Sequence, residues 1–154
     1  MIIPDVNLLV YAYNKSDPNH ASSLSWWESC MNGPEIVGLP WIVNSGFIRI
    51  MTHPRIMKNP MHVHKATKLV QTWISHPKVV TINPGPAFGD LFLRFLNQLG
   101  VGGNLTTDAQ IAALTVENQA ILHSCDMDFS RFEGLRWMNP IAIPANPRKP
   151  RNQR

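Results

Sequence analysis

Cysteine is scarce in this chain of 154 residues, and so are the features that mark secreted and membrane proteins. There are two cysteines, Cys30 and Cys125, and no Cys-x-x-Cys pair, which excludes a disulfide framework and a zinc site of the usual spacing. No apolar run reaches the roughly 18 residues that a transmembrane helix needs. The N-terminal Met-Ile-Ile-Pro-Asp lacks the basic start and the small-residue cleavage site of a signal peptide. We therefore expect a cytoplasmic protein with no membrane partner.

Acidic residues are also few, with 10 Asp and Glu against 14 Lys and Arg, so their positions are informative. A pI near 9.4 fits a polyanionic partner such as nucleic acid. Four of the positive charges lie in the last seven residues, and the remaining 10 Lys and Arg only balance the acids. The sequence thus predicts a neutral body followed by a basic tail.

The length suits one domain, and hydrophobic residues at 44% are enough for a packed core. We assign this domain to residues 1–143. Residues 144–154 are rich in proline and basic side chains, and we interpret them as a flexible basic tail.

Strand-like and helix-like segments alternate along the whole domain. Short apolar runs predict buried strands, and apolar residues at helical spacing predict helices. The expected strands lie at 1–5, 35–39, 78–82, 120–124 and 135–137, and the main helices at 20–31, 40–53, 60–75, 87–99 and 108–118. This alternation predicts an α/β fold with a mainly parallel sheet of four to five strands and helices on both faces.

Three aspartates fall where such a sheet binds ligands, at the carboxyl ends of its strands. Asp5 follows the first strand, Asp126 follows the fourth, and Asp108 lies in the first turn of the helix before the fourth strand. Carboxylates drawn together repel one another, and a hard divalent cation such as Mg²⁺ or Mn²⁺ relieves that repulsion. Such an ion can activate water and neutralise charge on a phosphodiester. Each aspartate also has an ordinary explanation, because Asp favours first helical turns and caps turns at strand ends.

Three segments around these aspartates resemble the motifs of PIN domains. Residues 2–7, Ile-Ile-Pro-Asp-Val-Asn, are similar to the opening motif of an apolar strand followed by Asp-x-Asn. Residues 105–114 are similar to the helix that carries an Asp followed by small apolar residues. Residues 124–132, beginning Ser-Cys-Asp-Met-Asp-Phe, are similar to the closing motif. The ordered set spans residues 2–137, including the continuation after the closing motif, and its size and layout resemble the VapC-type toxins of bacterial toxin–antitoxin pairs.

The resemblance implies a PIN-like three-layer sandwich and an endoribonuclease that needs Mg²⁺ or Mn²⁺. It implies that Asp5, Asp108 and Asp126 are the metal ligands, and that Asn7 and Ser124 support the site by hydrogen bonds. It also implies an RNA substrate, a homodimer, and inhibition by a cognate VapB-like antitoxin.

One position departs from the family pattern. The second PIN motif carries a Glu on the helix after the second strand, and Gly46 occupies the best-matching position here. Three carboxylates can still hold Mg²⁺, since waters fill its other positions. Asn44, Ser45 or Asp128 are candidates to take part of the missing role. The alternative is a catalytically degenerate PIN-like module that binds RNA or a protein partner.

Two further readings concern single residues. Asp5 as the covalent nucleophile of a phosphohydrolase would call for Asp-x-Asp-x-Thr, and the run here is Asp-Val-Asn-Leu-Leu. Arg49, His53 and Arg55 follow one another near the end of the second-motif helix. They are candidates to contact RNA phosphates or an antitoxin carboxylate, and a solvated face is the ordinary alternative.

Overall fold

The computed structural model describes residues 1–142, and at its centre lies a five-stranded sheet in which every pairing is parallel. The strands are β1 (Ile2–Pro4), β2 (Val37–Pro40), β3 (Val79–Ile82), β4 (Ile121–His123) and β5 (Trp137–Met138), in the spatial order β3-β2-β1-β4-β5. From β1 the chain adds β2 and β3 on one side and then crosses back to add β4 and β5 on the other. The strand order therefore reverses between β1 and β4. The predicted boundary after residue 143 and the basic tail at 144–154 lie outside the described residues.

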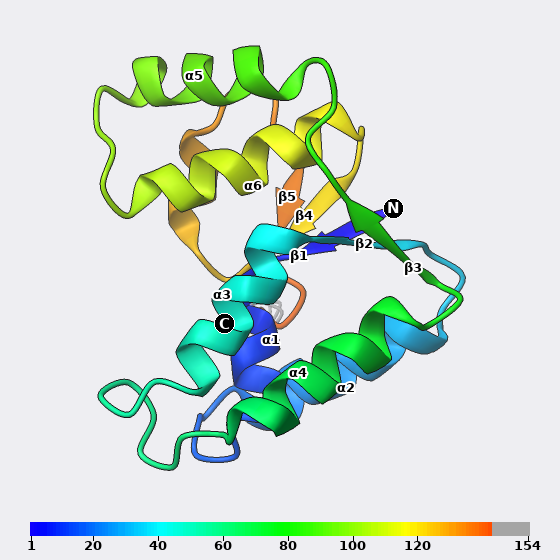
Figure 1. The fold of residues 1–154 in the computed structure, drawn as a ribbon. Helices are drawn as coiled ribbons and strands as arrows, with labels where there is room; N and C mark the ends of the chain where they lie inside the picture. The colour runs from blue at the N-terminus through cyan, green and yellow to red at the C-terminus, as the bar shows by residue number, and fades with distance from the viewer. Residues whose placement is uncertain (143–154) are drawn as a thin grey trace, which may run out of the picture.

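Helices cover both faces of this sheet, as the alternation of segments predicts. They are α1 (Val6–Tyr13), α2 (His20–Asn32), α3 (Trp41–Met51), α4 (Val63–Ile74), α5 (Phe88–Leu99) and α6 (Leu105–Glu117), with a 3₁₀ helix η1 (Met127–Arg131) after β4. Figure 1 shows α5 and α6 paired on one side of the sheet, with α1, α2 and α4 on the other. The predicted three-layer α/β fold is confirmed.

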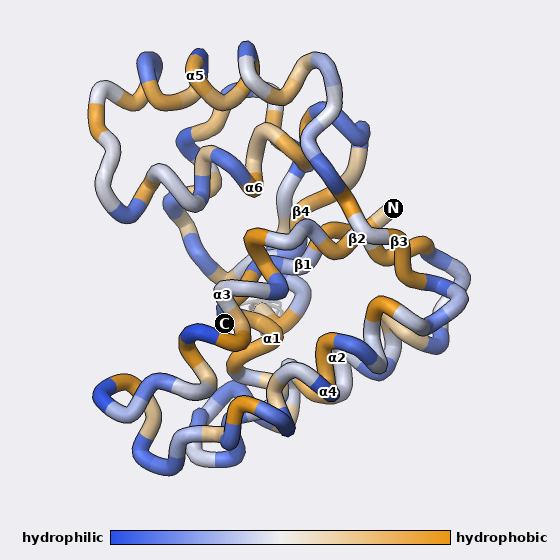
Figure 2. The backbone as a smooth tube through the Cα atoms, in the orientation of Figure 1, coloured by the Kyte–Doolittle hydropathy of each residue, from blue (hydrophilic) through white to orange (hydrophobic). Residues whose placement is uncertain are grey.

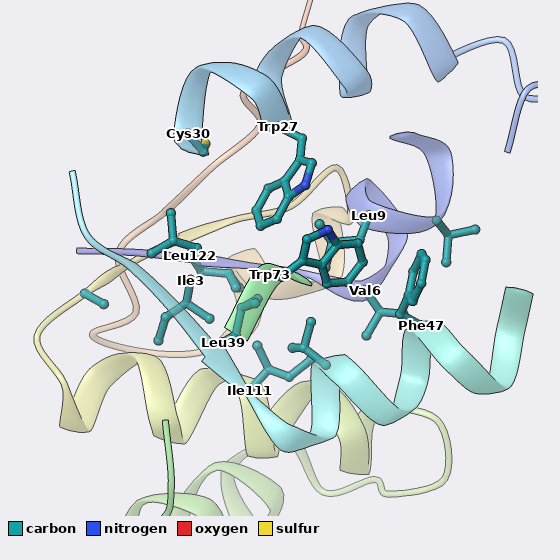
Figure 3. Close-up of a cluster of buried hydrophobic side chains, with 14 of the residues drawn as sticks. Ile3, Val6, Leu9, Trp27, Cys30, Leu39, Phe47, Trp73, Ile111 and Leu122 are labelled. Atoms are coloured by element: carbon teal, nitrogen blue, oxygen red, sulfur yellow. The ribbon is translucent and has the colours of Figure 1, made fainter. Parts of the chain in front are cut away.

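The core between the sheet and the α1–α4 layer is strongly aromatic. Trp27 of α2 and Phe47 of α3 both pack edge-on against Trp73 of α4, with ring centroids 5.5 and 4.7 Å from that of Trp73 (Figure 3). All four residues of β2 are buried, which suits a strand covered on both faces. Figure 2 shows hydrophobic residues gathered in the strands, whereas the outer turns of α5 are mostly hydrophilic. Helices thus pack against both faces of the sheet whose strand ends precede Asp5 and Asp126.

The helix that carries Asp108 begins earlier than its sequence predicts. We expected its first residue to be Asp108, but α6 begins at Leu105. Two tight turns start it, in which Leu105 N donates to the carbonyl of Gly102 and Thr106 N to that of Gly103. The preceding Asn104 already has helical dihedral angles. Asp108 nevertheless remains in the first turn of the helix.

Both cysteines are free thiols, which agrees with the absence of a disulfide framework. Cys30 is buried in α2, and Cys125 is partly buried with its Sγ 3.5 Å from Asn139 Oδ1. Burial raises the pKa of each thiol to about 11. Within residues 1–142, none of the helices has the length and apolar character needed to span a bilayer.

Candidate metal centre

The carboxyl ends of β1 and β4 bring two of the predicted aspartates to one edge of the sheet. Pro4 of β1 pairs with His123 of β4, and the Asp5 amide continues this ladder by donating to the His123 carbonyl at 2.9 Å. Asp126 follows three residues after His123. Because the strand order reverses between these two strands, their ends border the crevice where sheets of this kind bind ligands.

Ser124 joins Asp5 to the turn that carries Asp126. Its hydroxyl donates to Asp5 Oδ2 at 2.7 Å and accepts from the Asp126 amide at 3.0 Å. Ser124 is fully buried, and Asp5 is only 3% exposed. A hydroxyl that donates to a buried carboxylate makes a charge-assisted bond, which holds that carboxylate firmly. Ser124 therefore orients the Asp5 carboxylate and ties it to the turn that carries Asp126.

Asp5 and Asp126 also cap helices, so the ordinary explanation of these residues holds for both. Asp5 Oδ1 accepts from the Val6 amide at 2.7 Å at the start of α1. Asp126 Oδ1 accepts from the Asp128 amide at 2.8 Å at the start of η1. A carboxylate has about four lone-pair sites, so the bonds from Val6 and Ser124 to Asp5, and the capping bond to Asp126, still leave room for a cation. Capping and metal binding are compatible here.

Burial decides the protonation behaviour of Asp5. It raises the pKa of Asp5 to about 6, and the charge of Asp126 adds to the rise. Hydrogen bonds from Ser124, Val6 and Asn7 act in the opposite direction without overcoming it. Since a capping carboxylate ordinarily has a lowered pKa, desolvation and like-charge repulsion dominate at this position.

Asp108 belongs to the same electrostatic cluster, although it comes from the opposite helical layer. Burial raises the pKa of Asp108 to about 6, and the charges of Asp5, Asp126 and Asp128 raise it further. Neighbouring carboxylates that raise the pKa of Asp5 and Asp108 mark a place with unbalanced negative charge. A bound cation would reverse these shifts.

The chemistry of this donor set fits a hard divalent cation. Among residues 1–142, neither Asp5, Asp108 nor Asp126 takes part in an ion pair, so no side chain of that part neutralises them. In the same part of the chain, no three His, Cys, Asp or Glu side chains lie close enough together to form a ready-made metal cage. Mg²⁺ keeps several waters and is often held by one or two carboxylates, so a complete protein cage is not required.

Comparison with known proteins identifies the family. The model of the PIN domain matches residues 2–135. This chain belongs to the PIN-domain family. Ribonuclease VapC33 of Mycobacterium tuberculosis is 40% identical to it over 141 residues, covering 92% of this chain and 99% of the relative. Ribonuclease VapC37 of the same species is 38% identical, covering 93% of this chain and 99% of the relative.

Solved structures agree on the PIN fold at low sequence identity. The Mycobacterium tuberculosis toxin VapC20, described as cleaving the sarcin–ricin loop, superposes with a TM-score of 0.65 at 16% identity, covering 84% of this chain and 93% of that one. VapBC2 of Rickettsia felis, bound to a promoter DNA fragment, gives a TM-score of 0.63 at 20% identity, covering 90% of this chain and 98% of that one. These likenesses support the fold of this PIN domain.

Gly46, which the sequence predicts to stand where the family carries its glutamate, lies close to the first residue of α1. A Cβ atom built on Gly46 would lie 2.9 Å from Cγ2 of Val6, the first residue of α1. Any larger residue would push against the start of the helix that Asp5 caps. Gly46 thus lets α3 approach α1 closely, next to the aspartate cluster.

The three residues considered as substitutes for the family glutamate differ in their burial and their contacts. Asn44 is fully buried, and neither of its amide atoms has a hydrogen-bond partner among residues 1–142. Ser45 is exposed, and its hydroxyl donates to the Ile42 carbonyl of its own helix. Asp128 is half exposed and forms an ion pair with Arg131 at 3.6 Å. Of the three, Asp128 alone acts on the cluster, because its charge raises the pKa of Asp108.

Among the predicted supporting residues, Ser124 makes the direct side-chain contact already described. Asn7 acts differently, since its backbone amide, and not its side chain, helps to lower the pKa of Asp5. Asn7 also lines a surface cavity together with Tyr11 and Arg49.

Two residues near this candidate site were missed by sequence reasoning. Burial raises the pKa of Tyr11, and the charges of Asp17, Cys125, Asp5 and Asp126 add to the rise. Tyr11 lies on α1, the helix that Asp5 caps, and no motif in the sequence marks it. Trp26 donates from Nε1 to Nδ1 of His123 at 3.0 Å, and this contact joins α2 to the end of β4. No sequence pattern links residues so far apart.

Proposed function

We propose that this protein is a divalent-metal-dependent endoribonuclease toxin in which Asp5, Asp108 and Asp126 hold Mg²⁺ or Mn²⁺. The observation that carries the proposal is the cluster of mutually repelling carboxylates at the ends of β1 and β4. The hydroxyl of Ser124 joins the carboxylate of Asp5 to the backbone amide of Asp126. The relatives named as ribonucleases support RNA as the substrate.

Each residue of the cluster has a definite task in this proposal. Asp5 supplies a carboxylate whose orientation is fixed by Ser124 and by the Val6 amide. Asp108 and Asp126 would add carboxylate ligands from α6 and from the turn after β4. When bound, the cation supplies a Lewis acid that activates a water and offsets charge on the phosphodiester. Asp128 adds negative charge that strengthens attraction of the cation.

RNA cleavage by the purified chain tests this proposal. We expect cleavage of a mixed single-stranded RNA with Mg²⁺ or Mn²⁺ and none with EDTA. Asp5→Asn should lower the rate by about 100-fold or more, which corresponds to the loss of a group that stabilises charge in the transition state. Asp90→Asn is the matched control, because Asp90 is exposed on α5 away from the cluster. Unchanged cleavage by Asp5→Asn, or cleavage that survives EDTA, would remove this mechanism.

The second candidate is a degenerate PIN-like module that binds RNA or a protein without cutting RNA. The contact between Gly46 and Val6 favours it, because the family glutamate does not fit there unless Val6 moves. This candidate predicts that the chain binds RNA or a partner with no metal-stimulated cleavage. Cleavage that is lost on Asp5→Asn would exclude it.

We also infer a cognate VapB-like antitoxin, a homodimeric assembly and a cytoplasmic location for the protein. Fold neighbours solved as VapBC assemblies from Rickettsia felis and Haemophilus influenzae support a partner of this type. Co-expression with the product of the adjacent gene should yield a complex in which RNA cleavage is suppressed. Light scattering of the purified chain should give twice the monomer mass, and a monomeric mass would contradict the homodimer.

A further inference from the structure

Two neighbouring cavities lie on the surface around α1, α3 and α4, and together they are called the groove here. The inner cavity has a volume of about 390 Å³, and its wall includes Asn7, Tyr11 and Arg49. The outer cavity has a volume of about 420 Å³, and its wall includes Lys15 and Lys65. Asn14 and Met57 line both cavities, so the two lie next to each other.

The inner cavity includes residues that follow closely after Asp5 in the chain. Asn7 lies two residues after Asp5, in the first turn of the helix that Asp5 caps. Tyr11 lies one turn further along α1 and lines the same cavity, and the charges of Asp5 and Asp126 add to the rise in its pKa. The wall of the inner cavity thus begins in the helical turn next to Asp5.

The charged side chains of the groove favour an anionic occupant. Its walls carry Arg49, Lys15, Lys65 and the imidazole of His62, against the single carboxylate of Asp17. In the part of the chain from 1 to 142, neither Arg49 nor the two lysines forms an ion pair. Arg49 is exposed on α3. These cations are thus available to a ligand, and they lie on a domain whose body has no excess of positive charge.

The remaining wall suits unstacked bases. Met61, Tyr11 and Tyr13 are partly exposed and provide apolar and aromatic surface between the cations, whereas Met51 and Met57 line the cavities from the buried core. Single-stranded nucleic acids are bound by this combination of cations for phosphates and apolar or aromatic surface for bases. A duplex presents its bases already stacked and would leave such cavities unused.

We propose that this groove binds the single-stranded RNA that flanks the scissile phosphate, with Arg49 contacting a backbone phosphate next to the aspartate cluster and Lys65 one further along. This inference rests on the proposed ribonuclease function and names the path of its substrate. Arg49 is the most informative residue, because it alone brings positive charge to the inner cavity. Its guanidinium can bind a phosphate through two parallel hydrogen bonds.

RNA binding measured apart from cleavage tests this path. The probe is a short fluorescein-labelled single-stranded RNA of mixed sequence, titrated with the full chain in excess EDTA and followed by fluorescence anisotropy. We expect Arg49→Ala to weaken binding about fivefold at low salt and to reduce the slope of log Kd against log salt by about 0.7, the value of one phosphate contact. Lys65→Ala should act in the same direction with a smaller effect. Arg49→Lys should recover part of the affinity.

Matched controls separate the groove from general charge. Arg94→Ala removes one arginine from α5, in the other helical layer, and Lys68→Ala removes a lysine one turn from Lys65 that lies outside both cavities. Both should bind RNA like the parent. If Arg49→Ala and Arg94→Ala change Kd and the salt slope equally, the groove is not the RNA path.

The outcome for the groove is distinguishable from the outcome for the proposed function. If Asp5→Asn abolishes cleavage while Arg49→Ala leaves RNA binding unchanged, the ribonuclease stands and the groove proposal is wrong. If Arg49→Ala instead weakens only the complex with the antitoxin, the groove binds protein, and the proposal is again wrong. Loss of RNA binding on Arg49→Ala supports the groove whether or not the chain proves to cut RNA.

Discussion

Asp5 combines three roles in one buried side chain. It caps α1, it accepts the Ser124 hydroxyl, and its charge raises the pKa of Asp108. Two hydrogen bonds to a carboxylate normally stabilise its charged form, yet burial and the charge of Asp126 raise the pKa of Asp5 to about 6. In the metal-free protein near neutral pH, the ionised Asp5 is therefore a source of instability that a bound cation would remove.

Removing the charge of Asp5 should stabilise the metal-free protein in a pH-dependent way. Between about pH 4 and pH 6 the native state keeps a proton on Asp5 that the unfolded chain has released, so the unfolding free energy falls as pH rises through this window. In EDTA, we expect Asp5→Asn to match the parent near pH 4 and to exceed its stability by on the order of 2 kcal/mol above pH 6. Urea unfolding at several pH values measures the difference.

The comparison of variant and parent isolates Asp5 from other titrating groups. Burial lowers the pKa of His123, which opposes the trend at acidic pH, but this contribution is common to both proteins and cancels. Asp90→Asn, on the exposed face of α5, controls for the loss of one carboxylate. A stability gain that is the same at all pH values would contradict the raised pKa of Asp5.

The hydroxyl of Ser124 should matter for both stability and metal affinity. Ser124→Ala removes a donor to a buried carboxylate and an acceptor of the Asp126 amide, so we expect a loss of about 2 kcal/mol in unfolding free energy. Because the hydroxyl lowers the pKa of Asp5, its removal should also shift Mn²⁺ binding to higher pH. Ser130→Ala removes an exposed hydroxyl that donates to the Met127 carbonyl, and it should change neither property. Equal effects of the two variants would argue against the role of Ser124.

At the residue scale, the sequence identifies candidate site residues better than it predicts which other residues they contact. Asp5, Asp108, Asp126 and Ser124 are marked by short motifs, because each follows a strand end or opens a helix. The position of Tyr11 near the cluster depends on how α1 is oriented, and local sequence does not encode that orientation. The close contact between Gly46 and Val6 likewise depends on the packing of two helices.

At the element scale, α5 and α6 form a pair whose position determines where Asp108 lies. Glu117, the last residue of α6, accepts from the amides of Gly85 and Ala87 at 2.9 and 2.8 Å. These bonds anchor the segment between β3 and α5 to the end of α6. Gly100, in the left-handed conformation with φ of 66°, ends α5 and allows the chain to turn back toward α6.

Loss of the Glu117 carboxylate should loosen this pair of helices. We expect Glu117→Ala to lower the unfolding free energy by about 1 kcal/mol, since two backbone donors lose a partly exposed partner. Hydrogen exchange of the Gly85 and Ala87 amides should accelerate, while exchange in β1 should stay unchanged. Glu28→Ala, at an exposed position of α2, serves as the control. Unaltered exchange at Gly85 and Ala87 would show that the carboxylate does not anchor this segment.

Most helices and strands could be predicted because their apolar residues recur at the regular spacing of a helix or a strand. Their ends are also marked by proline, glycine or asparagine. The start of α6 is the instructive exception. The sequence predicts a helix that begins at Asp108, after a stretch that contains Gly102 and Gly103. Two tight turns let the helix begin at Leu105 with no side-chain cap, and such turns are weakly marked in a sequence.

At the scale of the whole molecule, one topological feature explains why the site exists. The strand order reverses between β1 and β4, so their carboxyl ends lie beside helices of both layers, with Asp5 and Ser124 buried at that point. Parallel pairing was predictable, because strands separated by helices must cross over. The order of the strands was not read from the sequence directly. It follows from long-range pairings such as that of Pro4 with His123.

Calorimetric titration with Mn²⁺ near pH 7.5 is the measurement that tests the central claim most directly. The account predicts binding by the full chain, and affinity reduced about tenfold or more in Asp5→Asn, Asp108→Asn and Asp126→Asn, because each variant removes one charged oxygen ligand. Asp90→Asn should bind like the parent. Absence of Mn²⁺ binding by the parent, or binding that is equal in all four variants, would contradict a metal centre formed by these three aspartates.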